Sequence, residues 1–137
     1  MRILLVPFIV LGLLGPAAAF SEADRAAVQS TILTQLNAFL TDDAATAYSF
    51  AAPNIRMMYP TEEMFMRMVQ QGYPQVYRPR QHAFGETRDT ERGIEQFVDI
   101  VDGEGRYWTA RYTLELQADG TWRITGCYIV EKPGEVA

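Results

Sequence analysis

Two residues of this sequence are candidate bases for an acid–base site. Asp99 lies within an apolar segment, and His82 is the single histidine. A carboxylate or imidazole base and a tyrosine hydroxyl can together move a proton on an organic substrate when both lie in an apolar cavity. The candidate proton donors are Tyr59, Tyr112 and Tyr128. A site of this kind requires a fold that brings a base and a donor together.

The side on which Asp99 lies depends on which face of its strand is buried. One face of residues 94–101 carries three branched apolar residues, and the other carries two apolar residues together with Asp99. The larger apolar set favours the first face as the buried one and predicts Asp99 on the outside. In the alternative register, Asp99 points inward beside Trp108 and Tyr112. His82 has no neighbour that marks a catalytic group, so it is expected at the surface or rim.

Closely spaced methionines raise the question of a soft-metal site. Met64, Met66 and Met68 follow the pair Met57 and Met58, and thioether sulfurs select Cu(I). On a helix, however, Met64 and Met68 share one face while Met66 points away, and methionine is a common filler of apolar gaps. One histidine and one cysteine also fall short of a zinc ligand set. The sequence therefore predicts neither a metal site nor a cofactor.

The element that must position any site is a long hairpin over residues 107–131. Apolar and polar residues alternate along both of its arms, which is the period of a half-buried strand. A three-residue loop that ends in glycine pairs Leu116 with Trp122. The same register sets Glu115 against Arg123, which is a favourable cross-strand pair.

This register gives the hairpin one inner face rich in aromatic residues. That face lines either a packed core or a cavity for a small apolar ligand, and the pattern leaves both alternatives open. Cys127 falls on the outer face, opposite Arg111, where it is expected to be a semi-buried filler. The candidate pocket residues are four hairpin aromatics and two residues of the preceding helices: Trp108, Tyr112, Trp122, Tyr128, Phe39 and Met68.

Helical signals fill the chain from residue 21 to about residue 71. Ser21 and Asp24 form a capping-box pattern ahead of apolar residues at helical spacing, which predicts a long helix. Capping residues and apolar spacing predict shorter helices after it. The predicted helices span residues 22–40, 44–51 and 62–71, with a turn or a single helical turn over 54–59.

Strand signals follow the helices. Short strands are predicted over residues 75–78 and 81–88, interrupted at Pro79, and a third over 94–101 ahead of the hairpin. Helices followed by antiparallel strands in a chain of this size define an α+β fold. We therefore predict a single α+β domain over residues 20–137, with N-terminal helices packed on a bent antiparallel sheet of about four strands.

The first 19 residues have the pattern of a secretory signal peptide. Arg2 precedes an apolar run over residues 3–14, and Ala17 and Ala19 are the small residues that signal peptidase needs. The run has 12 residues, which is too short for a membrane-spanning helix of about 20. We expect cleavage after Ala19, a periplasmic or secreted location, and no stable membrane insertion afterwards.

The chain that remains after this cleavage is small and acidic. Removal of 19 of the 137 residues leaves 118, the size of one domain with one core. Its 11 basic and 17 acidic side chains give a formal charge of −6, which argues against nucleic acid or anionic lipid as a partner. A single cysteine cannot form an internal disulfide, so stability is expected to come from packing.

Four runs of the sequence carry a resemblance to known proteins: QLNAFLTDD (35–43), YSFAAPNIR (48–56), YWTARY (107–112) and WRITGC (122–127). The order of a long helix, shorter helices and a meander that ends in two long strands resembles the nuclear transport factor 2-like superfamily. That cone-shaped fold is shared by ketosteroid isomerases and polyketide cyclases. The four runs resemble an uncharacterised family of exported bacterial proteins, domain of unknown function family 4864. The resemblance implies a fold and a compartment and assigns no chemistry.

These patterns together predict a non-catalytic module that binds a small apolar ligand inside the cone or a protein through its sheet. The resemblance also implies a homodimer. One alternative is an enzyme of the ketosteroid isomerase or cyclase type, with Asp99 or His82 as the base and Tyr59, Tyr112 or Tyr128 as the donor. Another alternative is a structural or accessory protein of the cell envelope.

Overall fold

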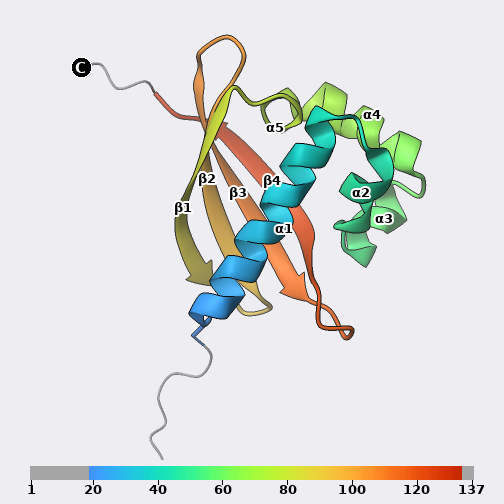
Figure 1. The fold of residues 1–137 in the computed structure, drawn as a ribbon, viewed down its shortest axis with the longest axis vertical. Helices are drawn as coiled ribbons and strands as arrows, with labels where there is room; N and C mark the ends of the chain where they lie inside the picture. The colour runs from blue at the N-terminus through green and yellow to red at the C-terminus, as the bar shows by residue number, and fades with distance from the viewer. Residues whose placement is uncertain (1–18, 134–137) are drawn as a thin grey trace, which may run out of the picture.

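The computed structural model describes residues 19–133. The predicted signal peptide, apart from Ala19, lies outside the described residues. The described chain forms helices first and strands after them (Figure 1). In chain order the elements are α1 (Glu22–Leu40), α2 (Ala44–Ser49), α3 (Pro53–Met58), α4 (Glu62–Gly72), α5 (Pro74–Tyr77), β1 (Gln81–Asp89), β2 (Ile94–Val101), β3 (Tyr107–Leu116) and β4 (Trp122–Glu131).

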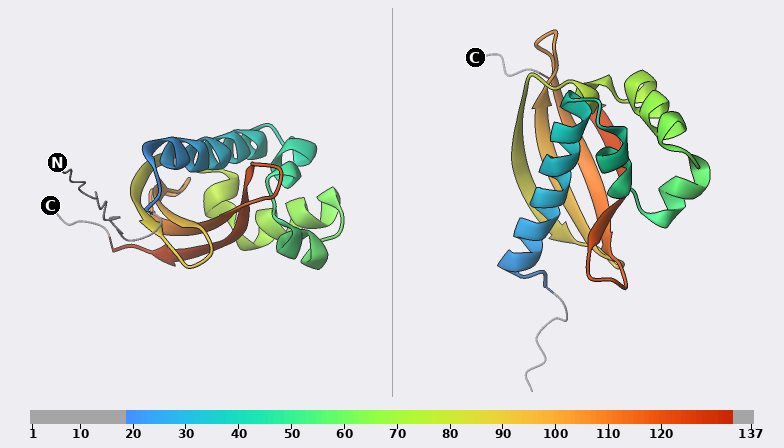
Figure 2. Two further views of the ribbon diagram at one scale, coloured as in Figure 1. Left: turned by 90° about the horizontal axis from the view of Figure 1, so that it is seen from below. Right: turned by 45° about the vertical axis from the view of Figure 1, so that its right-hand side comes forward.

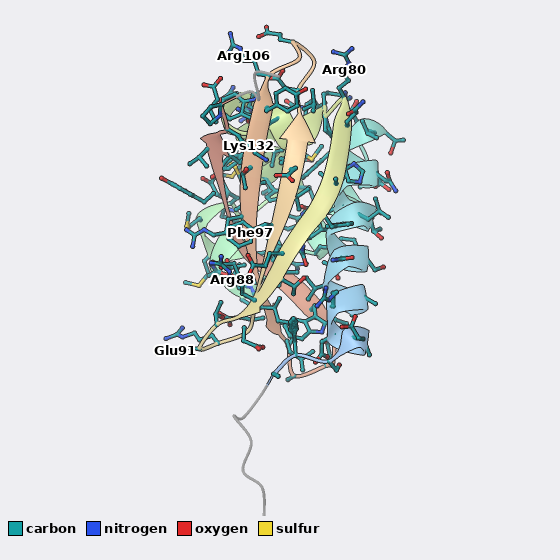
Figure 3. All side chains as sticks on the ribbon, turned by 90° about the vertical axis from the view of Figure 1, so that its left-hand side faces the viewer. Arg80, Arg88, Glu91, Phe97, Arg106 and Lys132 are labelled. Carbon is teal, nitrogen blue, oxygen red and sulfur yellow. The ribbon has the colours of Figure 1, made fainter. Side chains whose placement is uncertain are left out.

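The strands form one open antiparallel sheet in the order β1-β2-β3-β4. α1 lies across one face of this sheet, and α2, α3 and α4 gather at its β4 side (Figure 1, Figure 2). Figure 3 looks onto the opposite face, which no helix of the described chain covers. The prediction of an α+β fold, with N-terminal helices on a four-stranded antiparallel sheet, is confirmed.

α1 begins where the sequence predicts because its first backbone N–H groups find side-chain acceptors. The Ser21 hydroxyl accepts a hydrogen bond from the Asp24 N–H at 3.0 Å, and the Asp24 carboxylate accepts one from the Ser21 N–H at 3.1 Å. The inner side of the helix, with Val28 and Ile32 fully buried, packs into the core that also contains Val98 of β2. This part of the molecule is a packed core.

Gln96 is the polar side chain at the centre of this packed half, and it is fully buried. Its amide oxygen accepts hydrogen bonds from the Thr87 hydroxyl at 2.5 Å and from the Gln29 amide at 3.3 Å. Its nitrogen lies 3.1 Å and 3.2 Å from the carbonyl oxygens of Gly85 and Glu86, where the register of β1 shifts. The glutamine thus satisfies the backbone at an irregular point of β1.

The hairpin of β3 and β4 has the predicted register only near its loop. Leu116 pairs with Trp122 as predicted. Farther along, Thr113 pairs with Gly126, so that Thr125 is an extra residue in β4. Such a bulge exchanges the two faces of the strand that follows it, because side chains alternate with a period of two.

The strand predicted over residues 75–78 is wrong, because α5 occupies most of this segment. Pro74 fits the first turn of a helix, where its missing N–H is not needed, and the Arg78 N–H donates to the Pro74 carbonyl at 3.0 Å. Four residues are too few for apolar spacing to separate a strand from a helical turn. The other predicted helices and strands are confirmed within a few residues at their ends.

Candidate functional site

A cavity of about 250 Å³ lies between α3, α4, α5 and the inner side of β4. It is larger than an apolar cavity of about 150 Å³ that holds benzene and slightly smaller than the pockets of about 300 Å³ and more that take drug-sized ligands. Its apolar lining comes from α1, the three short helices and β4: Phe39, Ile55, Met58, Phe65, Met68, Val69, Val76 and Ile124.

The bulge of β4 holds one wall of this cavity in place. The Ile124 N–H donates to the Phe50 carbonyl at 2.8 Å, and the Ile124 carbonyl accepts from the Ala52 N–H at 2.9 Å. At the next residue, the Thr125 carbonyl accepts from the Asn54 side-chain amide at 2.9 Å. The bulge therefore binds the start of α3 through backbone groups of β4, and α3 lies over the cavity as a result.

The same bulge turns Cys127 into the cavity and Tyr128 out of it. Cys127 lies opposite Tyr112 and lines the cavity, so the prediction that it lies outside opposite Arg111 is wrong. Tyr128 takes that outer place, where it is 60% exposed and the Arg111 guanidinium lies 5.5 Å from its ring centre. Tyr128 is thus excluded from the pocket candidates by the one-residue shift after Thr125.

Two further aromatic candidates lie away from the cavity. Trp108 is at the start of β3, about 13 Å along the strand from Tyr112 at the usual rise per residue, and its ring N–H donates to the Asp102 carboxylate at 2.8 Å. It lines a different cavity, between α5 and the β2–β3 loop. Trp122 packs against the core next to the hairpin loop. Of the six predicted pocket residues, the cavity contains Phe39, Met68 and Tyr112.

The candidate bases do not reach this cavity. Asp99 faces outward, and the Lys132 ammonium lies 3.6 Å from its carboxylate. His82 is exposed on the edge strand β1, beside the ring of Phe84. Tyr59 does line the cavity, yet neither predicted base lies with it. The structure therefore separates the base from the donor that the enzyme alternative requires.

The polar groups inside the cavity are uncharged. Burial raises the pKa of the Cys127 thiol to about 12, so the thiol is protonated at neutral pH. Burial, together with the neighbouring Cys127, also raises the pKa of Tyr112 well above its ordinary value and raises the pKa of Tyr73. None of the lining residues in the described chain is acidic, basic or a histidine. The cavity thus presents apolar surface and neutral hydrogen-bonding groups.

The Tyr112 hydroxyl stands out among these groups. The residue is 2% exposed, and its hydroxyl oxygen has no hydrogen-bond partner among the described residues. Gln35, also buried at 5% exposure, donates from its amide nitrogen to the Ala47 carbonyl at 3.0 Å. A buried hydroxyl without a partner costs about 1–3 kcal/mol, and such an exception calls for an explanation.

The methionines are divided between the core, the cavity and the surface. Met58 and Met68 line the cavity, Met66 is buried in the core, and Met57, Met64 and also Met58 are exposed. Within residues 19–133, no group of three His, Cys, Asp or Glu side chains is placed to hold a metal ion.

Several residues of the cavity were not predicted from the sequence. Gln35 interrupts the apolar stripe of α1, and a polar residue at such a position is a usable signal of a buried polar site. Tyr73 and Asn54 lie next to prolines, in segments whose spacing gives no face. Cys127 was assigned to the wrong face, because the bulge has no clear sequence signal.

These observations define a class of protein: an α+β domain with a neutral, mostly apolar cavity between short helices and the end strand of its sheet. The chain belongs to the family described as Domain of unknown function (DUF4864), which matches residues 21–137. Comparisons with curated proteins and with solved structures found no match. No helix among the described residues is both long and apolar enough to cross a membrane.

Proposed function

We propose that this protein is a non-catalytic binding protein that holds one small, uncharged and largely apolar molecule in the cavity between α3, α4, α5 and β4. The observation that carries this proposal is the cavity itself: about 250 Å³, mostly apolar, and lined in part by Tyr112, whose buried hydroxyl has no partner among the described residues. A largely apolar pocket with a few placed polar groups is the usual form of a small-molecule site.

The absence of a suitable base favours binding over catalysis. A ketosteroid isomerase or cyclase type of reaction requires a carboxylate or imidazole near the substrate, and the described lining of the cavity contains neither. The tyrosines and the thiol that do line it have raised pKa values where a shift is resolved. They can donate hydrogen bonds at neutral pH, but they are poor proton acceptors.

The proposal includes a fold assignment and a compartment. The arrangement of α1 across an antiparallel four-stranded sheet supports the nuclear transport factor 2-like assignment (Figure 1). The signal-peptide pattern of residues 1–19 supports export to the periplasm or the medium. The small molecule would then be taken from outside the cytoplasm.

Native mass spectrometry of the protein purified without added ligand tests this function. We expect an adduct of organic mass on the wild type. Met68→Trp should fill the cavity and remove the adduct, whereas Met64→Trp, at an exposed position of the same helix, should keep it. An adduct that survives Met68→Trp in a folded protein would place the ligand elsewhere and contradict the proposal.

A second candidate, formation of a homodimer, is supported by the uncovered face of the sheet. Phe97 lies near the middle of this face, with Arg88 and Lys132 on either side of it (Figure 3). Glu95 bonds to Arg111 at 3.0 Å and lies 3.8 Å from Arg88, so charges of both signs alternate there. A twofold interface must be self-complementary, and a face with both signs of charge and exposed aromatic rings suits this requirement.

Light scattering on the purified protein tests the homodimer. We expect the mass of two chains for the wild type and of one chain for Tyr128→Lys, which places a new charge on the uncovered face. Met57→Lys, at an exposed position on α3, is the matched control and should leave the mass unchanged. A wild-type mass of one chain at high protein concentration would rule out this second candidate.

A further inference from the structure

One row of inner polar residues crosses the whole sheet, and its two halves differ in how well their hydrogen bonds are satisfied. Thr87 pairs with Gln96, Gln96 with Tyr112, and Tyr112 with Cys127, one residue from each strand. All four carry a polar atom, and all belong to the side of the sheet that faces the helices. A continuous polar row inside a small core is costly unless its members find partners.

The half of the row under α1 is fully paired. The Gln96 oxygen accepts from Thr87 and from Gln29, and its nitrogen donates to backbone carbonyls of β1. This network lies between the sheet and the long helix. Its polar atoms are all hydrogen-bonded to other protein groups, so none of them is available to a ligand.

The other half of the row, Tyr112 and Cys127, lines the cavity and lacks strong hydrogen-bond partners. The Tyr112 hydroxyl oxygen has less than 1 Å² of accessible surface and no partner among the described residues. Its neighbour across the strands is the Cys127 thiol, which is protonated at neutral pH and is a weak hydrogen-bonding group. The Tyr112 hydroxyl thus has only the weakly bonding Cys127 sulfur beside it and no strong acceptor among the described residues.

We propose that Tyr112 selects the ligand: an uncharged compound of one or two rings whose carbonyl oxygen accepts the hydrogen of the Tyr112 hydroxyl. This inference rests on the proposed binding function. The ring size follows from the cavity volume, which lies between that of a benzene site and that of a drug-sized pocket. The neutrality follows from a lining without charged side chains, which would leave a charged ligand unpaired.

Cys127 controls access to this hydroxyl. Its side chain has a single rotatable bond, and it lies directly across from Tyr112 on the inner face. Because the hydroxyl is covered in this structure, the proposed hydrogen bond to a ligand oxygen requires the Cys127 side chain to turn aside about that bond. In the bound state the Cys127 thiol would contact the apolar ring of the ligand in place of the Tyr112 hydroxyl, with which it pairs poorly.

Calorimetric titration with three bicyclic probes tests the inference. 1-Tetralone carries the carbonyl, tetralin lacks it, and 1-naphthoate carries a negative charge. On the wild type we expect 1-tetralone to bind about three- to tenfold more tightly than tetralin, the range of one net hydrogen bond. We expect 1-naphthoate to bind at least about tenfold more weakly than 1-tetralone, because its charge finds no partner.

Matched variants identify the donor. Tyr112→Phe should lower the tetralone preference to about one while tetralin still binds, which shows that the cavity remains intact. Tyr128→Phe, at an exposed tyrosine on the other face, should keep the wild-type preference. Cys127→Ala shortens the side chain that lies across from Tyr112 and should keep or increase the preference.

The outcomes separate this inference from the function on which it rests. Equal binding of tetralone and tetralin to the wild type, or a preference that survives Tyr112→Phe, would overturn the role of Tyr112 and leave a binding cavity. Tight binding of 1-naphthoate would overturn the neutrality of the ligand. If no probe binds and the purified wild type carries no adduct, the proposed function fails as well.

Discussion

Gln96 and Tyr112 pair on neighbouring strands and are both almost completely buried, yet their polar atoms differ in whether they find hydrogen-bond partners. Gln96 is surrounded by partners and closes an irregular stretch of β1. Tyr112 has a polar atom that no described residue satisfies. Burial alone therefore does not separate the two residues, whereas their satisfied hydrogen bonds do: Gln96 has a structural role, and Tyr112 is the residue to which we assign a binding role.

The largest expected effect concerns the thiol beside Tyr112. With a pKa of about 12, Cys127 should react with iodoacetamide at pH 8 roughly a thousandfold more slowly than a free cysteine of pKa about 8.5. Its rate should rise about tenfold per pH unit up to pH 11, because only the thiolate reacts. The urea-unfolded chain is the control. A rate that levels near pH 9 in the folded protein would place Cys127 at the surface.

The next effect tests the paired half of the row. Gln96→Leu keeps a similar volume but leaves the Thr87 hydroxyl, the Gln29 amide and three backbone carbonyls without their partner. We expect urea unfolding to show a loss of about 3 kcal/mol. Gln29→Leu removes a single bond of 3.3 Å and should cost less than about 1 kcal/mol. Equal costs for the two variants would mean that Gln96 is not the centre of the network.

Tyr112→Phe should change the free energy of unfolding in the opposite direction. Removing an unpartnered hydroxyl from an apolar site should stabilise the unliganded protein by about 1 kcal/mol in urea unfolding. Tyr48→Phe is the matched control, because the Tyr48 hydroxyl donates to the Tyr59 carbonyl at 2.6 Å; its loss should destabilise by about 1 kcal/mol. A loss of stability for both variants would show that Tyr112 has a structural partner, and the comparison with Gln96 would fail.

The smallest effect lies at the outer edge of the paired half. The Phe20 backbone nitrogen lies 3.3 Å from the Asp89 carboxylate. If cleavage follows Ala19, this nitrogen becomes a charged amine and forms an exposed ion pair worth about 0.5 kcal/mol. Asp89→Asn should therefore destabilise a chain that begins at Phe20 by about this amount more than a chain that keeps Ala19. No difference between the two chains would contradict the ion pair.

The sequence predicts best where a pattern is long and its ends are marked. Apolar spacing and the capping box place α1, and the pairing of Leu116 with Trp122 follows from the loop. α5 could not be predicted, because four residues carry no period. The part of β4 after the bulge at Thr125 is predicted on the wrong face. Gly126 stands where the apolar alternation expects an inner residue, and without a side chain it gives no sign of the one-residue shift in register.

The candidate site was predicted in part for the same reasons. Phe39, Met68 and Tyr112 lie in elements whose faces the patterns define, and they do line the cavity. Cys127 and Tyr128 exchanged places because the bulge at Thr125 depends on tertiary contacts with the start of α3. A side chain at position 126 would also come within 3.1 Å of the Thr113 hydroxyl, so glycine suits the bulge for reasons visible only in three dimensions.

The bulge at Thr125 also determines which side chains of β4 lie on the cavity side of the sheet and which lie on its uncovered face. If β4 kept Thr125 but paired regularly, Thr125 would lie opposite Thr113, Cys127 and Ile129 would move to the uncovered face, and Tyr128 and Val130 would turn inward. Loss of the bulge without loss of a residue would thus change the cavity wall and the outer face of the sheet together. A shift in the register of β4 therefore alters both faces of the sheet at once, whereas a substitution alters one face at a time.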